Sequence, residues 1–249
     1  MCGVIELMSQ SGYVTSRETE IIRILRVLSE ATEGFVVVGG YAVNAFGQHR
    51  FSVDCDLATD RDNVPVIDAT LLREGYELRR NEVRPPIGVA IREYRKSVGG
   101  ETASLELLVD TVVSTTTRGT WTYGFIQNNS VEAIIVGATD STPSRVAQRN
   151  LLVAMKLHTG RTEDLKDVVM LSERVDWKAV ARCAACGSKE QLGEQIESAI
   201  REISSTKFAS DLKSSFAMRT DPASLIKRAV LGLSTLRTLV AQEKFKDSL

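Results

Sequence analysis

The stretch from residue 35 to residue 57 constrains the fold more than any other part of this chain. It opens with the β-branched run Phe35-Val-Val-Val38, which is typical of a strand buried in the centre of a sheet. The pair Gly39-Gly40 ends this run abruptly, and a short helical segment over 41–46 follows. Residues 51–57 then alternate between apolar and polar side chains, which predicts a second strand. The segment is therefore expected to form a strand, a glycine turn, a short helix and another strand.

The second of these strands carries two carboxylates on one face. Asp54 and Asp56 project from that face, and the other face carries apolar side chains, namely Phe51, Val53, Cys55 and Leu57. Carboxylates at i and i+2 of a strand lie about 7 Å apart, close enough to share one or two hard cations such as Mg²⁺. The glycine pair lets the backbone approach a ligand closely, which suits an anion such as a triphosphate. Each feature alone has an ordinary alternative, a plain turn or a solvated strand face.

The remaining patterns divide the chain near residue 140. Before that point we expect two further helices and three further strands, over 15–31, 63–74, 88–96, 103–109 and 133–136. Thr15 and Glu18 form a capping-box pair at the start of the first of these helices. Beyond Pro143 helical periodicity predicts six helices, over 144–158, 162–174, 176–186, 189–204, 208–217 and 222–246. The expected architecture is an α/β domain with a mixed sheet over 1–140, followed by a helical bundle over 141–249.

The two halves differ in the sign of their charge, although the formal net charge of the 249 residues is −1. Residues 1–140 carry 13 basic and 19 acidic side chains, whereas residues 141–249 carry 18 basic and 13 acidic ones. An acidic half is typical of carboxylates clustered around metal, and a basic half of phosphate-bearing partners. Uneven surface charge without function is the alternative.

Several protein classes are excluded by composition. No stretch approaches the roughly 18 uninterrupted apolar residues of a membrane helix, and the N-terminus lacks a signal-peptide pattern. We therefore expect a cytoplasmic protein. The four cysteines are too few and too uneven for a disulfide framework. We interpret Cys183 and Cys186, which form a CxxC motif, as buried helical thiols rather than half of a zinc site, because no second CxxC is present.

A row of arginines follows the first sheet segments. Five arginines interleave with Tyr76 and Tyr94, namely Arg79, Arg80, Arg84, Arg92 and Arg95. Such a pattern suits a wall that stacks bases and binds phosphates. We favour the simpler interpretation, the solvated edge of a hairpin.

Two adjacent motifs resemble a known family. Val38-Gly-Gly-Tyr-Ala-Val-Asn-Ala-Phe-Gly47, followed by Arg50-Phe-Ser-Val-Asp-Cys-Asp-Leu57, is similar to the signature of the nucleotidyltransferase superfamily, specifically its AbiEii-like and minimal nucleotidyltransferase branches. These proteins usually carry a GG or GS turn, a spacer with a basic residue, and Ser/Thr-x-Asp-x-Asp. The resemblance implies the nucleotidyltransferase fold, a nucleoside triphosphate as substrate, and a two-ion Mg²⁺ site at Asp54 and Asp56.

The resemblance also implies a third metal-binding carboxylate on a later strand. Glu106 lies between Leu105 and Leu107, at the place where relatives typically carry Asp before two aliphatic residues. Asp110 lies on the same strand face, toward its end, and is the alternative. We favour Glu106, although Glu in place of Asp departs from the family pattern.

A further resemblance lies in the helical half. Asn150-Leu-Leu-Val-Ala-Met-Lys156-Leu157, followed by Arg161-Thr-Glu-Asp164-Leu-Lys-Asp167, is similar to an AbiEii-type pattern of two helices. By this resemblance Lys156 contacts nucleotide phosphates, and Asp167, with Asp164, orients that lysine or serves the nucleophile. Lys156 lies in an apolar stretch, so its ammonium group needs a phosphate or carboxylate partner. A snorkelling lysine beside an ordinary acidic helix face is the alternative.

Together these resemblances imply Mg²⁺-dependent transfer of a nucleoside monophosphate from a nucleoside triphosphate to a hydroxyl group. The implied catalytic residues are Asp54, Asp56, Glu106, Lys156 and Asp167. The implied nucleotide-binding residues are Gly39, Gly40, Arg50, Ser52 and Asp164. The AbiEii-like branch implies a toxin of a type IV toxin–antitoxin pair that modifies tRNA or another cellular acceptor, with an antitoxin protein as partner. The alternatives are a small-molecule nucleotidyltransferase of the aminoglycoside-modifying kind and an inactive fold that binds nucleotides or proteins.

Overall fold

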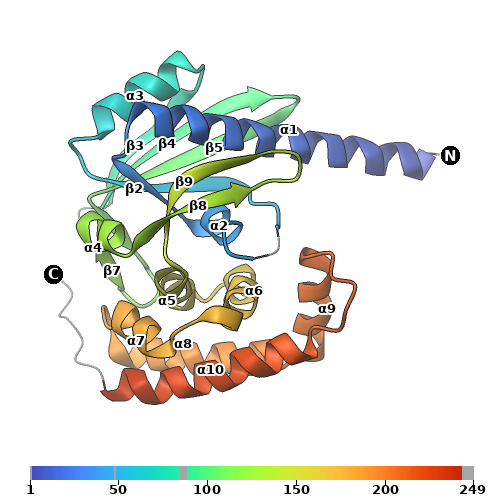
Figure 1. The fold of residues 1–249 in the computed structure, drawn as a ribbon, viewed down its shortest axis with the longest axis vertical. Helices are drawn as coiled ribbons and strands as arrows, with labels where there is room; N and C mark the ends of the chain where they lie inside the picture. The colour runs from blue at the N-terminus through green and yellow to red at the C-terminus, as the bar shows by residue number, and fades with distance from the viewer. Residues whose placement is uncertain (1, 48, 85–88, 243–249) are drawn as a thin grey trace. The chain divides into compact units, whose positions relative to one another are not determined.

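The computed structural model describes residues 2–47, 49–84 and 89–242, which form two compact units (Figure 1). The first unit comprises residues 1–45, 49–111 and 123–147. The second comprises residues 46–48, 112–122 and 148–249. Each unit therefore contains segments that are distant in sequence.

The first unit is built on a mixed sheet of seven strands. These are β1 (Phe35–Val38), β2 (Asp54–Thr59), β3 (Glu77–Arg84), β4 (Val89–Val98), β5 (Glu101–Val109), β8 (Ser130–Val136) and β9 (Ser141–Ala147). Their order across the sheet is β3-β4-β5-β2-β1-β9-β8. Strand β1 is parallel to β9 and β2 is parallel to β5, whereas the other neighbours are antiparallel. The expected mixed sheet is confirmed.

Two longer helices, α1 (Cys2–Ala31) and α3 (Val64–Arg73), belong to this unit, and the shorter helices α2 (Gly39–Val43) and α4 (Tyr123–Asn128) contact β1 and β2 (Figure 1). Helix α1 contacts β4, β5, β9 and α3, and it buries the apolar stripe expected from its periodicity, namely Ile21, Ile22, Leu25 and Leu28. The expected start of this helix at Thr15 is wrong, because the helix begins at Cys2. Glu18 caps nothing, since its carboxylate accepts hydrogen bonds from the backbone N–H of Ala138 (2.6 Å) and from Nε2 of His49 (2.6 Å).

The alternation of strand residues gives the sheet an apolar face and a polar face. Cys55, Leu57, Leu105 and Tyr94 are fully buried on the side of α1 and α3. The expected strand over 51–57 begins only at Asp54, and Val53 in the preceding loop is 60% exposed. Pairing of β2 with β5 begins at Asp54, so Cys55 is the first apolar residue of this strand that the sheet buries.

Two strands of the seven-stranded sheet, β3 and β9, escaped the sequence-based expectation, as did the two short strands over 111–113 and 120–122. The helix expected over 144–158 begins at Arg149, since residues 141–147 form β9. Thr142, Ser144 and Val146 are the buried positions of β9, and their alternation is concealed because two of them are polar. The edge strand β3 was missed because it is charged and exposed. Gly88, the expected first residue of the next strand, lies outside the described residues.

The second unit is mainly helical, as expected. Its helices are α5 (Arg149–Thr159), α6 (Thr162–Leu171), α7 (Trp177–Ala184), α8 (Lys189–Ile203), α9 (Thr206–Ser215) and α10 (Ala223–Gln242). Residues 243–246, the expected end of the last helix, lie outside the described residues. The unit also receives the hairpin of β6 (Thr111–Val113) and β7 (Thr120–Thr122). Within the described ranges, no helix is both long enough and apolar enough to cross a membrane.

The hairpin packs on the helices around His158. The ring of His158 is fully buried, its Nδ1 lies 2.5 Å from Thr117 Oγ1, and its Nε2 lies 3.0 Å from the carbonyl oxygen of Ala184. Trp121 lies edge-on to this ring and donates a hydrogen bond to the carbonyl oxygen of Cys183 (2.8 Å). Cys183 is a buried thiol of α7, as expected, and burial raises its pKa to about 11. The expectation is wrong for Cys186, which follows the end of α7 and is only half-buried. Thr117 in the connection of the hairpin and Trp121 on β7 are therefore part of the core of the helical unit.

Candidate functional site

The glycine pair lies at the start of α2 (Gly39–Val43), directly after β1. Gly39 has a φ of +66°, a left-handed conformation that favours glycine. A Cβ atom on Gly39 would lie 2.1 Å from Oδ2 of Asp56, and one on Gly40 would lie 2.3 Å from Oγ of Ser52 and 3.2 Å from Nη2 of Arg50. Both glycines therefore make room for the side chains of Arg50, Ser52 and Asp56. This packing explains the GG pair, whereas its contact with phosphate stays a prediction.

Two carboxylates lie side by side on the polar face of the sheet. In the parallel pair of β2 and β5, Asp56 is directly opposite Glu106, and Asp54 is opposite Ser104. Because neighbouring strands are about 4.8 Å apart, the side chains of Asp56 and Glu106 are adjacent. Asp56 and Glu106 are half-buried, and Asp54 is exposed. The register between distant strands thus places Glu106 beside Asp56, whereas Asp54 lies two positions earlier on β2, opposite Ser104.

The alternative third carboxylate, Asp110, lies elsewhere. It follows the end of β5 in a left-handed conformation with a φ of +63°. Its two oxygens accept hydrogen bonds from the backbone N–H of Arg61 (3.0 Å) and from the guanidinium Nε (2.9 Å) and Nη2 (2.6 Å) of the same residue. Four residues of strand place it about 13 Å along the chain from Glu106. Glu106, and not Asp110, is therefore the neighbour of Asp56.

Glu106 has a second neighbour that sequence reasoning did not foresee. The registers place Glu106 opposite Glu93 on β4, and Glu93 opposite Arg80 on β3. Nη2 of Arg80 donates to Oε1 of Glu106, and Nε of Arg80 lies 3.8 Å from Oε2 of Glu93. Asp56, Glu106, Glu93 and Arg80 therefore form a row across four strands. Strand alternation alone could have placed Glu93 on this face, but not in this register.

The donor chemistry of this row fits a hard divalent cation. Carboxylate oxygens are the ligands that Mg²⁺ prefers, and Asp54, Asp56 and Glu106 share one face of the sheet. The part of the chain that the structure describes contains no preformed group of three or more His, Cys, Asp or Glu side chains positioned to hold a metal ion. Glu106 is ion-paired with Arg80 instead. The positive charge of Arg80 beside Glu106 therefore opposes the binding of a cation by the same carboxylate.

A second cluster of predicted site residues lies within the helical unit. Nζ of Lys156 on α5 lies 2.6 Å from Oδ1 of Asp164 and 2.9 Å from Oδ2 of Asp167, both on α6. Asp164 also accepts hydrogen bonds from Thr159 Oγ1 (2.6 Å) and Arg161 Nε (2.7 Å). Lys156, Asp164 and Asp167 are all buried. The two aspartates thus contact the lysine that they were expected to orient, and any contact of Lys156 with phosphate stays a prediction.

The buried pair shifts the pKa values of its members in opposite directions. Burial by itself lowers the pKa of Lys156, but the charges of Asp167 and Asp164 outweigh it and the net shift is upward. Burial raises the pKa of Asp164, but the charge of Lys156 and the hydrogen bonds outweigh it and the net shift is downward. Both net shifts therefore favour an ammonium ion held by carboxylates, although burial opposes them.

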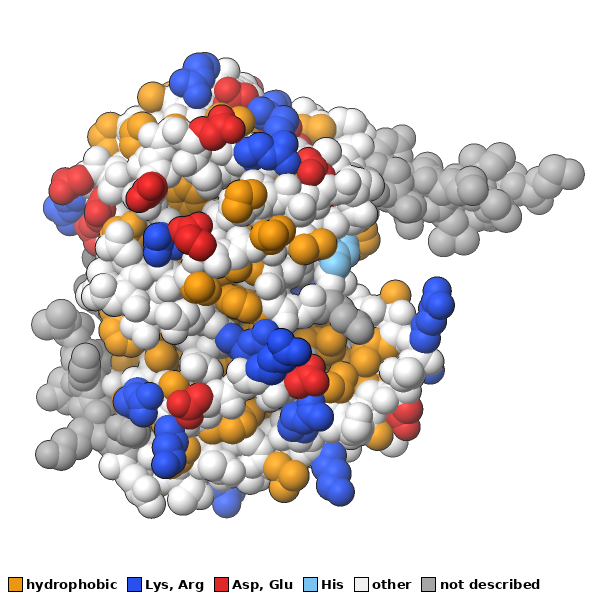
Figure 2. Space-filling view, viewed as in Figure 1, with side chains coloured by type: hydrophobic (Ala, Val, Ile, Leu, Met, Phe, Trp, Pro, Cys, Tyr) orange, Lys and Arg blue, Asp and Glu red, His pale blue; other side chains and the backbone are white. Residues whose placement is uncertain are grey.

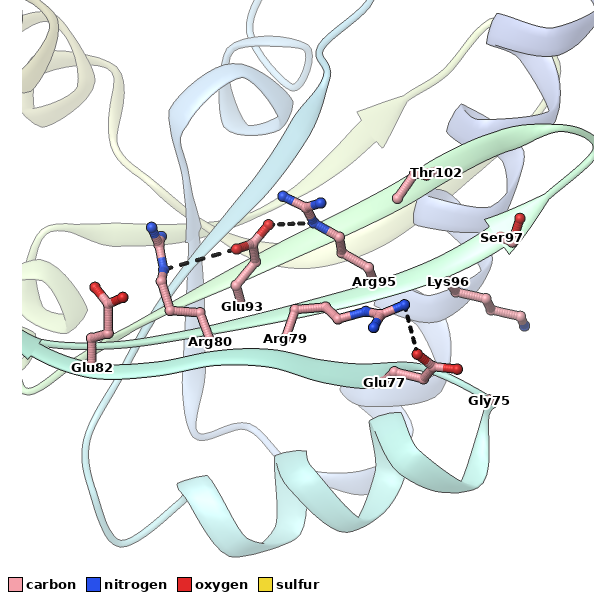
Figure 3. A pocket seen from close by; sticks show the side chains of 10 residues that line it. All are labelled: Gly75, Glu77, Arg79, Arg80, Glu82, Glu93, Arg95, Lys96, Ser97 and Thr102. Carbon is pink, nitrogen blue, oxygen red and sulfur yellow. Dashed lines mark hydrogen bonds and ion pairs between the residues drawn. The ribbon is translucent and has the colours of Figure 1, made fainter.

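The row of arginines does not form a base-stacking wall. Tyr76 and Tyr94 are buried, with exposed fractions of 2% and 0%, so neither offers a ring to a base. Arg92 turns to the helical side, where its Nη2 lies 2.5 Å from Oδ2 of Asp68. Arg80 and Arg95 lie on the polar face with Glu93 between them (Figure 3). The side chain of Arg84 lies outside the described residues.

The polar face carries a groove of about 590 Å³ over β3 and β4 (Figure 3). Its charged lining consists mainly of Glu77, Arg79, Arg80, Glu82, Glu93 and Arg95. Arg80 belongs both to this groove and to the row that contains Glu106. Glu93 does the same, so two side chains join the groove to the row that contains the candidate metal site.

No protein-family model matches the chain, and no curated protein matches it in sequence. Solved structures that share features of the fold include a candidate nucleotidyltransferase from H. pylori, 15% identical, covering 90% of this chain and 93% of that one, with a TM-score of 0.44. JHP933 from Helicobacter pylori is 14% identical, with coverages of 90% and 92% and a TM-score of 0.44. The antibiotic-resistance factor ANT(2'')-Ia is 14% identical, with coverages of 68% and 91% and a TM-score of 0.46. Similarity this low assigns no family, and the geometry of the site has to carry the functional conclusion.

Proposed function

We propose that this chain is a Mg²⁺-dependent nucleotidyltransferase that moves a nucleoside monophosphate from a nucleoside triphosphate to a hydroxyl group. The observation that carries the proposal is the fit between the glycine pair and the carboxylate strand. The absence of a side chain at Gly39 leaves room for Asp56, and its absence at Gly40 leaves room for Ser52 and Arg50. The register of β2 and β5 places Glu106 beside Asp56. A strand face that is merely solvated would not require this packing, because aspartates that point into water do not need two consecutive glycines opposite them.

In the proposed reaction the acceptor oxygen forms a bond to the α-phosphorus, and the bond from that phosphorus to the bridging oxygen of the β-phosphate breaks. Pyrophosphate leaves, and the hydroxyl proton passes to water. Arg50 and Ser52, beside Gly40, are the groups that would bind and orient phosphate oxygens. Asp54, Asp56 and Glu106 would hold Mg²⁺, which when bound neutralises charge on the triphosphate and on the leaving pyrophosphate.

We assign the buried cluster of the helical unit a positioning role in the same proposal. Asp164 and Asp167 keep Lys156 charged and immobile at the junction of α5 and α6. A fixed ammonium group suits the binding of a triphosphate or of the leaving pyrophosphate. The exposed fraction of the Lys156 side chain is 8%, and the proposed contact with phosphate would be made through that exposed part.

For the acceptor we propose a cellular RNA such as tRNA, as in an AbiEii-like toxin that has an antitoxin partner in the cytoplasm. The basic excess of residues 141–249 supports an anionic acceptor over a small cationic one. One observation favours a second candidate, an inactive nucleotide-binding module. This is the ion pair between Arg80 and Glu106, which occupies the third carboxylate.

The deciding experiment incubates the full chain with each labelled nucleoside triphosphate, Mg²⁺ and total tRNA. We expect label on RNA, reduced at least about 100-fold by Asp56→Ala, since such a change removes charge stabilisation made in the transition state. Glu30→Ala is the matched control, because Glu30 is an exposed acidic residue of α1. Binding of nucleotide without transfer to any acceptor would instead support the inactive module.

A further inference from the structure

Arg80 stands between the groove over β3 and β4 and the carboxylates of the candidate metal site. Its Nη2 donates to Glu106, while its Nε is buried and has no hydrogen-bond partner among the described residues. The carboxylate of Glu93 is 3.8 Å from this Nε, too far for a hydrogen bond. The guanidinium group is therefore only partly satisfied where it lies, which is costly for a buried donor.

A β-bulge aims this part of the strand at the groove. The pairing of β3 with β4 shifts by one residue between Leu78 and Arg80, so Arg79 is the extra residue of the bulge. Bulges re-aim side chains, and here the consecutive residues Arg79 and Arg80 both line the groove. Regular alternation would have sent one of them to the opposite face.

The other guanidinium groups of the groove are accessible. The exposed fractions of the Arg79 and Arg95 side chains are 59% and 53%, and their carboxylate partners are Glu77 at 2.9 Å and Glu93 at 2.5 Å (Figure 3). Exposed ion pairs of this kind contribute little and exchange easily for another anion. Three guanidinium groups on two neighbouring strands therefore suit a linear polyanion, because guanidinium binds phosphate oxygens in a planar, two-point geometry.

We propose that Arg80 has two alternative partners, Glu106 and a phosphate group of an RNA chain bound in the groove. Without RNA, the guanidinium group occupies Glu106 and competes there with a divalent cation for the same carboxylate. With RNA bound, Arg80 pairs with phosphate, and its positive charge no longer opposes the binding of metal by Glu106, Asp54 and Asp56. This inference rests on the proposed function and extends it, since it names the acceptor site and makes assembly of the metal site depend on the acceptor.

The mechanism requires a reciprocal coupling of two binding equilibria. If RNA strengthens metal binding by some factor, the metal must strengthen RNA binding by the same factor. Couplings of this type are commonly about fivefold or more. We therefore expect RNA to tighten metal binding to the wild-type chain by at least about fivefold.

The test measures binding of Mn²⁺ by electron paramagnetic resonance, with and without a single-stranded oligoribonucleotide of about eight nucleotides, a length within the site sizes of single-strand binding grooves. Fluorescence anisotropy of the labelled oligonucleotide gives the reverse coupling. Arg80→Gln is expected to bind Mn²⁺ about fivefold or more tightly without RNA, and to lose the coupling. Glu106→Gln is expected to bind Mn²⁺ more weakly than wild type, and also without coupling.

Arg95→Gln is the matched control, because Arg95 lines the same groove but pairs with Glu93 rather than Glu106. We expect it to weaken RNA binding and to keep both the wild-type affinity for Mn²⁺ and the coupling. The inference is overturned if the coupling persists in Arg80→Gln. It is also overturned if the affinity for RNA does not change when the groove arginines are replaced. If the wild type nevertheless transfers nucleotide in the assay above, the proposed function stands and only the role of Arg80 fails. Absence of Mn²⁺ binding in every variant overturns both.

Discussion

At the scale of single residues, His158 links the stability of the helical unit to pH. Burial lowers the pKa of its imidazole from 6.5 to about 4, although its hydrogen bond to Ala184 acts in the opposite direction. The unfolded chain therefore takes up a proton near pH 6.5, while the folded chain resists protonation until about pH 4. The stabilisation is complete above pH 6.5 and is lost as the pH falls toward 4.

We expect this one group to remove about 3 kcal/mol of unfolding free energy between pH 6.5 and pH 4. Urea unfolding of the wild type and of His158→Gln across this range measures it, and the variant should show the shallower dependence. His49→Gln is the control, since His49 is the other histidine of the chain. Equal slopes for the wild type and His158→Gln would contradict this origin of the pH dependence.

Replacement by alanine is expected to change the stability of the protein in opposite directions at Gly39 and at Gly193. Gly39→Ala forces a side chain into a left-handed conformation and into Oδ2 of Asp56, so we expect a loss of about 1–3 kcal/mol in stability. Displacement of Asp56 should also weaken Mn²⁺ binding. Gly193→Ala, within α8, meets nothing within 4 Å and should raise stability by up to about 1 kcal/mol. Thermal unfolding separates the two, and a neutral Gly39→Ala would remove the structural reason for the glycine pair.

At the scale of helices and strands, the junction of α5 and α6 depends on charges that are buried together. Lys156→Met removes the buried ammonium group that contacts both Asp164 and Asp167, and breaking a buried ion pair by removing one partner costs about 3–5 kcal/mol. Lys166→Met is the matched control, because Lys166 is also buried but its partner Glu163 is 63% exposed. Its loss should cost about 1 kcal/mol or less. Chemical denaturation compares them, and equal costs would show that the cluster of Lys156 does not hold α5 to α6.

The elements themselves show which local patterns were informative. The apolar stripe of α1, the buried run of β1 and the helical periodicity after residue 149 all lie within single elements, so each could be predicted from spacing along the chain. Strand β9 could not, because Thr142 and Ser144 are buried polar residues whose alternation resembles a helical start. Strand β3 could not either, since its charged residues form a ladder only in the presence of β4.

At the scale of the whole molecule, the salt dependence of RNA binding reports how many basic side chains contact the RNA. On the face shown in Figure 2, Lys and Arg side chains are interspersed with acidic and apolar ones rather than gathered in one continuous patch. If RNA contacts the three groove arginines alone, the logarithm of the binding constant should fall against the logarithm of salt with a slope of about −2. Arg79→Gln together with Arg95→Gln should reduce the slope to about −1.

Anisotropy titrations between about 50 and 200 mM salt give this slope. A value much steeper than −2 would mean that basic side chains outside the groove also bind RNA. The excess of basic over acidic side chains in residues 141–249 could supply them. A slope near zero would mean that phosphates are not the groups recognised. The slope therefore gives the number of basic side chains that contact RNA phosphates.

The candidate site was only partly predictable. Gly39, Gly40, Asp54 and Asp56 lie within 18 positions of one another, and the order of their elements already suggested that they meet. Glu106 was chosen over Asp110 on resemblance, and the register with Asp56 now supplies a physical reason for that choice. The pairing of Glu106 with Arg80 had no signal in the sequence, since it depends on two further registers and a bulge.

The sequence by itself determined the local elements of this protein, because side-chain periodicity and glycine conformation are properties of neighbouring residues. It thereby determined that two carboxylates follow a glycine turn on a half-buried strand. Only the tertiary structure decided which groups stand opposite them, because strand register is set by hydrogen bonds and burial between segments far apart in the chain. The same holds for Lys156, whose need for a partner was evident in the sequence. Folding of α6 against α5 decided that two carboxylates fill that need.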